Sequence, residues 1–172
     1  MSFIKGRVVA LEPLTPEHIG PPWLSWLNDP AIMRWRARRM PYRASEMARH
    51  VDNAEGDLRL AIEHHCRHVG NIALGSINWA HRSAELSILV GKPGLGYGTD
   101  AVEALARHAL QHMGLNRLWA ESPNPAFNRI MGKLGWTHEG TKREAFMLDG
   151  RFISVECWGL LAAEGKQSTR SA

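Results

Sequence analysis

The glycine-rich stretch GKPGLGYGTD, residues 91–100, has the composition of a binding site for a phosphate group. Four glycines fall within eight residues, and the apolar positions behind them have helical spacing. The first turn of a helix carries N–H groups without backbone partners and a partial positive charge, and both attract anions. Glycines permit positive φ and let a phosphate approach the backbone. The stretch therefore predicts a phosphate-binding loop, with a flexible strand-to-helix connection as the alternative.

Two common phosphate motifs do not match this loop. A Walker motif requires Gly-Lys-Ser/Thr after four spacer residues, whereas Gly96 is followed by Tyr97. The dinucleotide pattern GxGxxG also differs from the observed order Gly94-x-Gly96-x-Gly98.

The elements around the loop predict a mixed α/β domain. Strand-like runs cover 6–12, 57–65, 68–78, 84–91, 116–122, 136–147 and 152–161, and Asp149-Gly150 predicts a hairpin between the last two. A helix is expected behind Thr15, with a break at Gly20-Pro21-Pro22, and a second one from Asp29 to about Ala37. A third is expected over 45–54, with Ser45 as its cap. The fourth runs from the glycines to about Met113 and carries a Glu103–Arg107 pair, and the fifth covers 125–134 and is ended by Gly135.

Length and composition limit the class of protein. The 172 residues suit one domain over 1–161, followed by a flexible tail over 162–172. No signal peptide or long apolar run is visible, so a cytoplasmic protein without a membrane segment is expected. Only Cys66 and Cys157 are present, which fits a reducing compartment. The net charge of +4 favours anionic ligands without requiring nucleic acid.

Other clusters of chemistry-bearing residues have less support. The run EHHCRH suggests a metal site at His64, His65, Cys66 and His68, but a strand sends neighbouring side chains to opposite faces, so no metal is expected. Neither cysteine has a clear base that would make it a nucleophile.

Five arginines, Arg34, Arg36, Arg38, Arg39 and Arg43, fall within ten residues. They form either a solvated surface or a wall that meets a phosphorylated or carboxylated substrate. The stretch lacks the interleaved aromatic residues of a nucleic-acid stacking platform.

Three segments, ILVGKPGLGYGTDAVEAL, NPAFNRIMGKLGWTHEGTKREAF and WLNDPAIMRW, resemble the GNAT superfamily of N-acetyltransferases, and the third resembles its ribosomal-protein-acetyltransferase-like branch. The resemblance covers about 7–161. It implies a single GNAT-like α/β domain with a mixed, mostly antiparallel sheet of about seven strands, helices on both faces, and splayed fourth and fifth strands. A homodimer is implied by the resemblance alone.

The resemblance also implies acetyl-CoA as the co-substrate and assigns its contacts. The backbone near Leu89 and Val90 would pair with the pantetheine arm, and Asn124 and Asn128 would face the coenzyme. The pyrophosphate would receive backbone N–H groups from Gly94, Leu95, Gly96, Tyr97, Gly98 and Thr99.

The chain departs from the family where an acid would protonate the departing thiolate. Met131 stands where many members have tyrosine, and Phe127 stands where members of the ribosomal-protein branch have serine. A thiol pKa near 8.5 makes an acid helpful rather than necessary. A non-catalytic module that binds acetyl-CoA therefore remains an alternative to an enzyme.

An amine that attacks a thioester must first lose its proton, and three residues are candidate bases. Glu85, four residues before Leu89, is the first candidate, with a cross-strand ion pair as its alternative role. Glu139 in THEG is the second, and His81, in a turn, is the third.

The acceptor is predicted less sharply. The segments NIALGSINWAHRSAELSILVG and LNDPAIMRWRARR resemble a branch that acetylates nucleotide-linked amino sugars, with the arginines on the diphosphate and Trp35 or Trp79 beside the sugar. Ser87, where related chains often have glycine, weakens this analogy. The alternatives are the N-terminal amine of a protein and a cationic aminoglycoside, against which the arginines argue.

Overall fold

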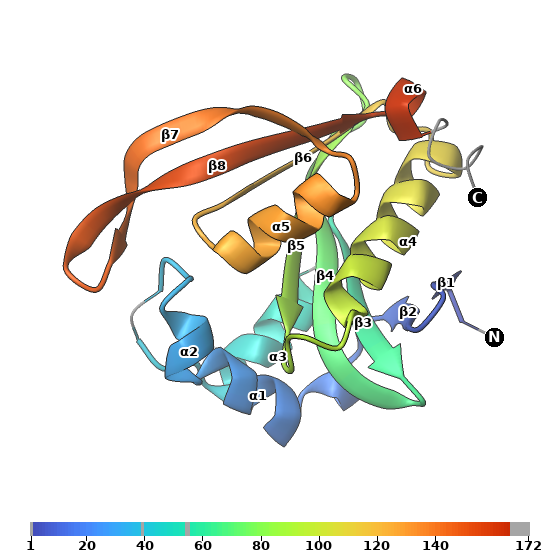
Figure 1. Ribbon diagram of the computed structural model, residues 1–172. Coiled ribbons are helices and arrows are strands. Elements are labelled where there is room, and N and C mark those ends of the chain that lie inside the picture. Colours follow the sequence, from blue (N-terminus) through green and yellow to red (C-terminus); the bar gives the residue numbers. More distant parts are fainter. Residues whose placement is uncertain (1, 39, 54–55, 166–172) are drawn as a thin grey trace.

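The computed structural model describes residues 2–38, 40–53 and 56–165. In this part of the chain, eight strands form one sheet in the order β1-β2-β3-β4-β5-β6-β8-β7 (Figure 1). The expected mixed, mostly antiparallel sheet with helices on both faces is confirmed, and β1 adds a strand to the expected seven. The strands are β1 (Ile4–Lys5), β2 (Ala10–Pro13), β3 (Leu58–His64), β4 (Arg67–Asn78), β5 (Ser83–Val90), β6 (Arg117–Ser122), β7 (Thr137–Leu148) and β8 (Arg151–Leu161). The helices are η1 (Pro16–His18), α1 (Pro21–Leu27), α2 (Pro30–Met33), α3 (Ala44–Asp52), α4 (Tyr97–Gln111), α5 (Pro125–Lys133) and α6 (Ala162–Gly165).

The strand pairing changes character between β5 and β6. Strands β2 to β5 form an antiparallel meander, as the sequence predicts. Strands β5 and β6 are parallel and pair only where Ser83–Glu85 face Arg117–Trp119. The family's fourth and fifth strands correspond to β5 and β6, so their expected splay is confirmed, and it begins after Glu85.

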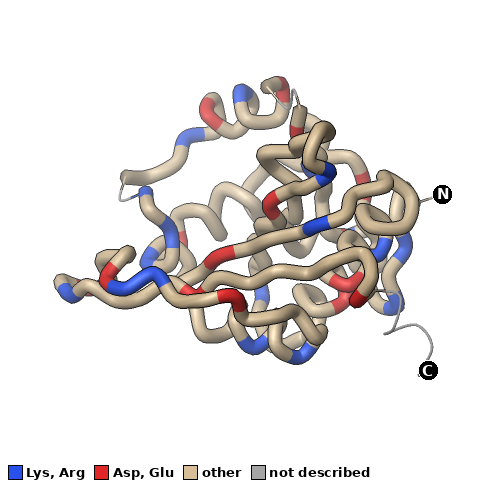
Figure 2. Tube along the Cα trace, turned by 90° about the horizontal axis from the view of Figure 1, so that it is seen from above, with Lys and Arg blue, Asp and Glu red and all other residues tan. Residues whose placement is uncertain are grey.

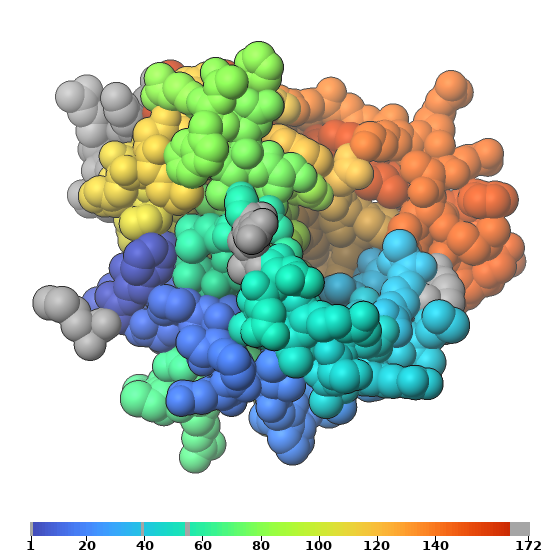
Figure 3. All heavy atoms as spheres, turned by 180° about the vertical axis from the view of Figure 1, so that it is seen from behind, coloured from blue at the N-terminus to red at the C-terminus, as the bar shows by residue number. Residues whose placement is uncertain are grey.

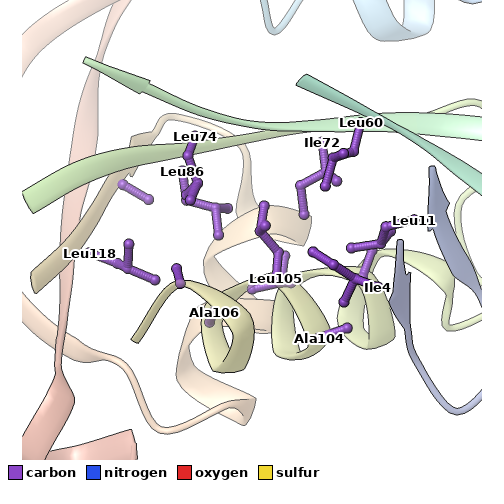
Figure 4. Packing of buried hydrophobic residues seen from close by; sticks show 14 of the residues in the cluster. Ile4, Leu11, Leu60, Ile72, Leu74, Leu86, Ala104, Leu105, Ala106 and Leu118 are labelled. Carbon is purple, nitrogen blue, oxygen red and sulfur yellow. The ribbon is translucent and has the colours of Figure 1, made fainter. Parts of the chain in front are cut away.

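The main core lies between the sheet and α4. Alternation along β4 and β5 points Ile72, Leu74 and Leu86 toward α4, where they surround Leu105 (Figure 4). All four side chains are at most 2% exposed. The opposite face of the sheet is covered by α1 and α3, whose Trp23, Leu27 and Met47 form a second cluster that packs against Leu89.

A buried carboxylate ties the N-terminal segment to the start of α4. Asp100 is 6% exposed and accepts hydrogen bonds from the backbone N–H groups of Arg7, Val8 and Val9, at 2.9, 2.7 and 2.9 Å. The strand predicted over 6–12 is therefore wrong in its first half, because these N–H groups point to a side chain instead of a neighbouring strand. Strand β2 begins only at Ala10.

Several helix boundaries also differ from the sequence prediction. Gly20 is the N-cap of α1, so Pro21 and Pro22 start that helix instead of interrupting it. The N-cap of α3 is Arg43, and Ser45 lies inside the helix. The second helix, α2, ends at Met33, short of the expected Ala37.

At the surface, Glu103 pairs with Arg7 and not with the expected Arg107. The expected hairpin turn is confirmed, since Asp149 and Gly150 both have positive φ, +48° and +81°. The first four residues of the predicted tail form α6, and 166–172 lie outside the described residues.

We predict that Asp100→Asn lowers the free energy of unfolding at pH 7 by about 2 kcal/mol, because the amide leaves buried N–H groups without an acceptor. Burial alone would raise the pKa of Asp100, but the three backbone donors outweigh it and hold the pKa below its ordinary value. A lowered folded-state pKa stabilises above the unfolded value and is lost as pH falls through the folded pKa. The difference between wild type and variant should therefore shrink in urea titrations below about pH 4. The control is Glu103→Gln, which removes a carboxylate that pairs with the exposed Arg7 side chain. An equal loss of stability in this control would contradict the role of Asp100.

Candidate active site

The gap between β5 and β6 exposes strand backbone that has no partner strand. Just past the end of β5, the N–H of Gly91 donates to the carbonyl of Val69 in β4, at 2.9 Å. Because N–H directions alternate along a strand, the N–H and C=O of Val90 point the opposite way, into the gap. The expected position of Leu89 and Val90 beside a pantetheine arm is compatible with this geometry.

The glycine-rich loop follows directly from β5, and its glycines have different structural reasons. Gly94 and Gly96 have φ of +91° and +78°, and Gly96 is the N-cap of α4. A Cβ at Gly91 would lie 2.1 Å from the ring of Trp26, so the bare backbone lets α1 pack against the loop. Gly98 is buried where a Cβ would meet Ile130 and Val90 at 3.2 and 3.3 Å. The loop is thus fixed against both faces of the molecule at the N-terminus of a long helix.

A cavity of about 670 Å³ connects this loop with the gap and with α5. It contains most of the predicted coenzyme contacts, namely Leu89, Val90, Gly94, Gly96, Tyr97, Gly98, Thr99 and Asn124. We call this space the donor cavity. Two predicted contacts do not line it: Leu95 is 56% exposed at the loop surface, and Asn128 points elsewhere.

The two asparagines predicted to face the coenzyme have structural partners in the protein. Asn124 caps α5, because its Oδ1 accepts the N–H of Ala126 at 2.9 Å. Asn128 donates to the Ser122 carbonyl at 3.3 Å and accepts from the Trp158 indole at 3.1 Å. Asn128 therefore joins α5 to β6 and β8, and its predicted contact with the coenzyme stays a prediction.

A second cavity, of about 390 Å³, lies on the other face of the sheet beneath α1 and α3. Its charged lining residues are Arg36, Arg38, Arg59 and Glu46, and Ser87 and Leu89 of β5 also line it. The two cavities share Arg36, Ile88 and Leu89, so they meet at the splayed end of β5. We call this second space the acceptor cavity. The molecular surface is hollowed between the α2–α3 segment and the β7–β8 hairpin (Figure 3).

Glu85 lies where the splay begins, half-buried on the face of β5 that also carries Ser87 and Leu89. Burial raises the pKa of its carboxyl above the ordinary value, the nearby charges of Glu121 and Asp57 raise it further, and Lys142 lowers it. About four residues of strand, roughly 13 Å, separate it from Leu89, so a proton would reach it through water or the acceptor itself.

The other two candidate bases are not brought to the cavities. Arg117 binds both oxygens of Glu139 at 2.5 Å and, through these hydrogen bonds, lowers the pKa of that carboxyl. His81 lies exposed in the β4–β5 turn, at the end of β5 opposite the loop, where its N–H donates to Asn78. The structure therefore argues against both Glu139 and His81 as the base.

Met131 and Phe127, which replace the acids of related enzymes, lie in different surroundings. Met131 is completely buried in the main core and does not line the donor cavity. Phe127 lines the donor cavity. The ring of Tyr97 packs against His64 with centroids 4.9 Å apart.

The arginine-rich segment is divided among several tasks. Arg36 and Arg38 lie against the ring of Tyr42, and Arg38 also pairs with Glu46 at 2.9 Å. Arg34 pairs with Asp149 at the hairpin tip, and Arg43 caps α3. Arg39 lies outside the described residues. Basic positions thus occur on both the α2–α3 connection and the β7–β8 hairpin (Figure 2).

The tryptophans and the histidine run also differ from expectation. Trp35 lines the donor cavity instead of an acceptor pocket, and Trp79 is 60% exposed and lines neither cavity. Among the residues that the structure describes, no group of three His, Cys, Asp or Glu side chains is placed to hold a metal ion. Within the same residues, no helix has the length and apolar character needed to cross a membrane.

Sequence reasoning missed Trp26, Glu121 and Lys142. Trp26 fills the space that Gly91 leaves, and Glu121 and Lys142 pair beside Glu85. The loss of a side chain at Gly91 was visible, but its partner lies 65 positions earlier in the chain, beyond any local pattern. The charged pair joins β6 to β7, and only the strand order reveals that neighbourhood.

The loop at the start of α4, the splayed strands and the Val90 backbone directed into the gap define an acyltransferase site for a pantetheine thioester. Residues 9–137 match the family described as acetyltransferase (GNAT) domain, and the chain belongs to this family. It is an acetyl-CoA-dependent N-acetyltransferase.

Solved structures support the fold. Spermidine N-acetyltransferase from Vibrio cholerae, in complex with CoA and spermine, has a TM-score of 0.81 and 21% identity over 92% of this chain and 98% of its own. Mycobacterium smegmatis RimJ, in complex with CoA-disulfide, has a TM-score of 0.78 and 18% identity over 97% and 94%. The microcin C7 self-immunity acetyltransferase MccE, in complex with acetyl-CoA and AMP, has a TM-score of 0.76 and 18% identity over 90% and 93%. No protein of curated function matches the sequence significantly.

We predict that Gly96→Ala raises the dissociation constant for acetyl-CoA about tenfold, the cost of losing one hydrogen bond to a charged group. The methyl group would occupy the space in front of the helix N-terminus, at a residue whose φ of +78° disfavours a side chain. Gly114→Ala is the matched control, because Gly114 has a φ of +72° and equally open surroundings away from both cavities. Titration calorimetry that finds equal affinities for the two variants would contradict the assignment of the loop.

Proposed function

We propose that this enzyme transfers the acetyl group of acetyl-CoA to the primary amine of a small anionic acceptor, such as a nucleotide-linked amino sugar. The observation behind the proposal is the acceptor cavity. Three arginines and one glutamate are its charged lining residues, and it meets the donor cavity at Leu89.

The charge of the acceptor cavity supports an anionic acceptor over a polyamine. Its other titratable lining side chains include His50, whose pKa is lowered by burial and by the charges of Arg59 and Arg36, so it is neutral at pH 7. Arg38 pairs with Glu46 and Arg59 pairs with Asp57, so three guanidinium groups meet two carboxylates. The remaining excess of positive charge repels a cationic acceptor and attracts phosphate or carboxylate. The MccE structure, in which acetyl-CoA and AMP are bound together, offers a precedent for a nucleotide in this fold.

The proposed chemistry uses few groups of the protein. Acetyl-CoA supplies the thioester carbonyl. Glu85 takes the proton of the acceptor ammonium, through water, so that the nitrogen lone pair can form a bond to the carbonyl carbon. The N–H of Val90 donates to the carbonyl oxygen as negative charge develops there. The C–S bond then breaks and the nitrogen releases its second proton to solvent, which leaves a neutral amide. Because Met131 and Phe127 have no proton to give, the thiolate takes its proton from solvent.

The second candidate function is acetylation of a protein N-terminus, as in the ribosomal-protein branch. The hollow between the α2–α3 segment and the hairpin is open to the surface, as an extended peptide would require (Figure 3). The arginines of the acceptor cavity would then meet an acidic peptide. A non-catalytic module is the third alternative.

Release of free CoA thiol from acetyl-CoA, measured against a panel of amines, tests these alternatives. The panel contains UDP-linked amino sugars, short peptides with free N-termini, spermidine and an aminoglycoside. We expect turnover with the sugar nucleotides. Turnover with peptides alone would replace the proposal by its second candidate, and acetyl-CoA binding without turnover on any amine would favour the module.

We predict that Arg36→Gln raises the KM of an anionic acceptor about tenfold, because a charge-assisted hydrogen bond is lost. Arg36→Lys should restore part of the affinity. Arg34→Gln removes a neighbouring charge that lines neither cavity and is the control. A KM that rises equally in Arg34→Gln would show that general electrostatic attraction, and not Arg36, binds the acceptor.

We also predict that Glu85→Gln lowers kcat at least about a hundredfold while acetyl-CoA binding is unchanged. A base must be deprotonated to work, and the pKa of Glu85 is raised. The wild-type kcat/KM should therefore rise with pH through a range above that of an ordinary glutamate and then level off. Glu139→Gln should keep its turnover, and the opposite pattern between the two variants would exchange their roles.

A further inference from the structure

Glu121 of β6 and Lys142 of β7 lie near Glu85, on the same face of the sheet. Parallel pairing sets Trp119 of β6 against Glu85 of β5, and Glu121 follows two residues later on that face. The alternate residues of β6, Leu118 and Ala120, point into the main core with Ala84 and Leu86 of β5. Glu121 therefore lies two residues beyond Trp119, the partner of Glu85, at the point where β5 and β6 begin to separate.

Lys142 reaches this position from β7. Its ammonium group forms an ion pair with the Glu121 carboxylate, although the sheet order places β8 between their strands. The Lys142 and Glu121 side chains are 55% and 34% exposed, and an ion pair at such exposure contributes little to stability. Folding alone gives no strong reason for this pair.

The remaining surroundings of Glu85 are sparse. On β4 its paired residue is Gly75, which has no side chain to shield it. Beyond Gly75 stands Asp57, which is held by Arg59 at 2.9 Å and by the N–H of Ser76. The charged groups that act on Glu85 are therefore two carboxylates, Asp57 and Glu121, and one ammonium group, Lys142.

We propose that Glu121 and Lys142 are positioning residues for Glu85, acting as a pair of opposite charges that sets its readiness to accept the proton of the acceptor amine. This inference rests on the proposed role of Glu85 as the base. Asp57 is already paired with Arg59. The other charges that act on the pKa of Glu85 are those of the Glu121–Lys142 pair. The two members act on the pKa of Glu85 in opposite directions, so each offsets part of the effect of the other.

The sign of each effect follows from its charge. Glu121 raises the pKa of Glu85 and Lys142 lowers it, in addition to the larger effect of burial. Glu121→Gln removes a negative charge and leaves the ammonium group, so Glu85 should titrate at lower pH. Lys142→Gln leaves Glu121 without its counterion, so Glu85 should titrate at higher pH.

The titration of Glu85 is measured directly, without an acceptor. Glutamate labelled with ¹³C at the side-chain carboxyl is incorporated into the full chain, and Glu85→Gln identifies the resonance. We expect the midpoint to move down in Glu121→Gln, up in Lys142→Gln, and to lie between these two values in the double variant. With the panel amine that is acetylated fastest, kcat/KM below the midpoint should rise or fall about threefold accordingly.

The matched control is Glu156→Gln. Glu156 lies on the β7–β8 hairpin, as Lys142 does, and its carboxylate binds His138 and Thr141. Its neighbour Cys157 is the residue paired with Glu121, so Glu156 itself points to the opposite face of the sheet. This variant makes the same change of charge and should leave the Glu85 midpoint in place. A merely structural role of the pair would lower activity at every pH without moving the midpoint, and opposite shifts cannot come from general destabilisation.

Two failures can be told apart. Midpoints that move no further than in Glu156→Gln, with Glu85→Gln inactive, would overturn the role of the pair and leave Glu85 as the base. Full turnover in Glu85→Gln would overturn the proposed base and the positioning role with it, whatever the midpoints do.

Discussion

The pairing of β5 with β6 over only three residues is the constraint on which this active site depends. A sheet normally satisfies the backbone groups of each inner strand from both sides. Here the register ends at Glu85 and Trp119, so the backbone of Val90 has only a gap on the β6 side. A ligand that offers peptide-like groups can replace the missing strand, and the pantetheine arm of acetyl-CoA is such a ligand. The splay converts unpaired strand edges, which elsewhere favour aggregation, into a binding site.

The rest of the fold holds this gap open from both sides. On one face, Gly98 lets α4 approach Ile130 of α5, and Met131 fixes α5 in the core. On the other face, Trp26 packs on Gly91 and joins α1 to the beginning of the loop. Asp100 then ties the N-terminal segment to the first turn of α4. These contacts hold the two ends of the loop at Gly91 and Gly98, while residues 92–96 between them remain exposed to solvent.

How much the sequence predicts depends on the range of the interactions. The strands of the meander, α4 and the Asp149-Gly150 turn follow from local periodicity and turn chemistry, and the structure agrees with them. The segment 6–9 looks like a strand because it is apolar, but the distant Asp100 takes its N–H groups. For the site, the glycine loop was readable because backbone chemistry is local. The roles of Asn128 and Glu139 were not, since each depends on a partner, Trp158 or Arg117, that only the strand order brings near.

The β7–β8 hairpin gives the acceptor side a character that differs from the donor side. It extends away from the rest of the sheet (Figure 1), with most of β7 exposed. Ion pairs still connect it to the parts of the protein that do chemistry: Asp149 to Arg34 beside the arginine segment, and Lys142 to Glu121 beside Glu85. Exposed ion pairs contribute little to stability and depend on salt, so they orient the hairpin without fixing it rigidly. The donor side is held by packing, whereas the acceptor side is held by charge, and a site built in this way can keep its co-substrate constant while the acceptor differs between related proteins.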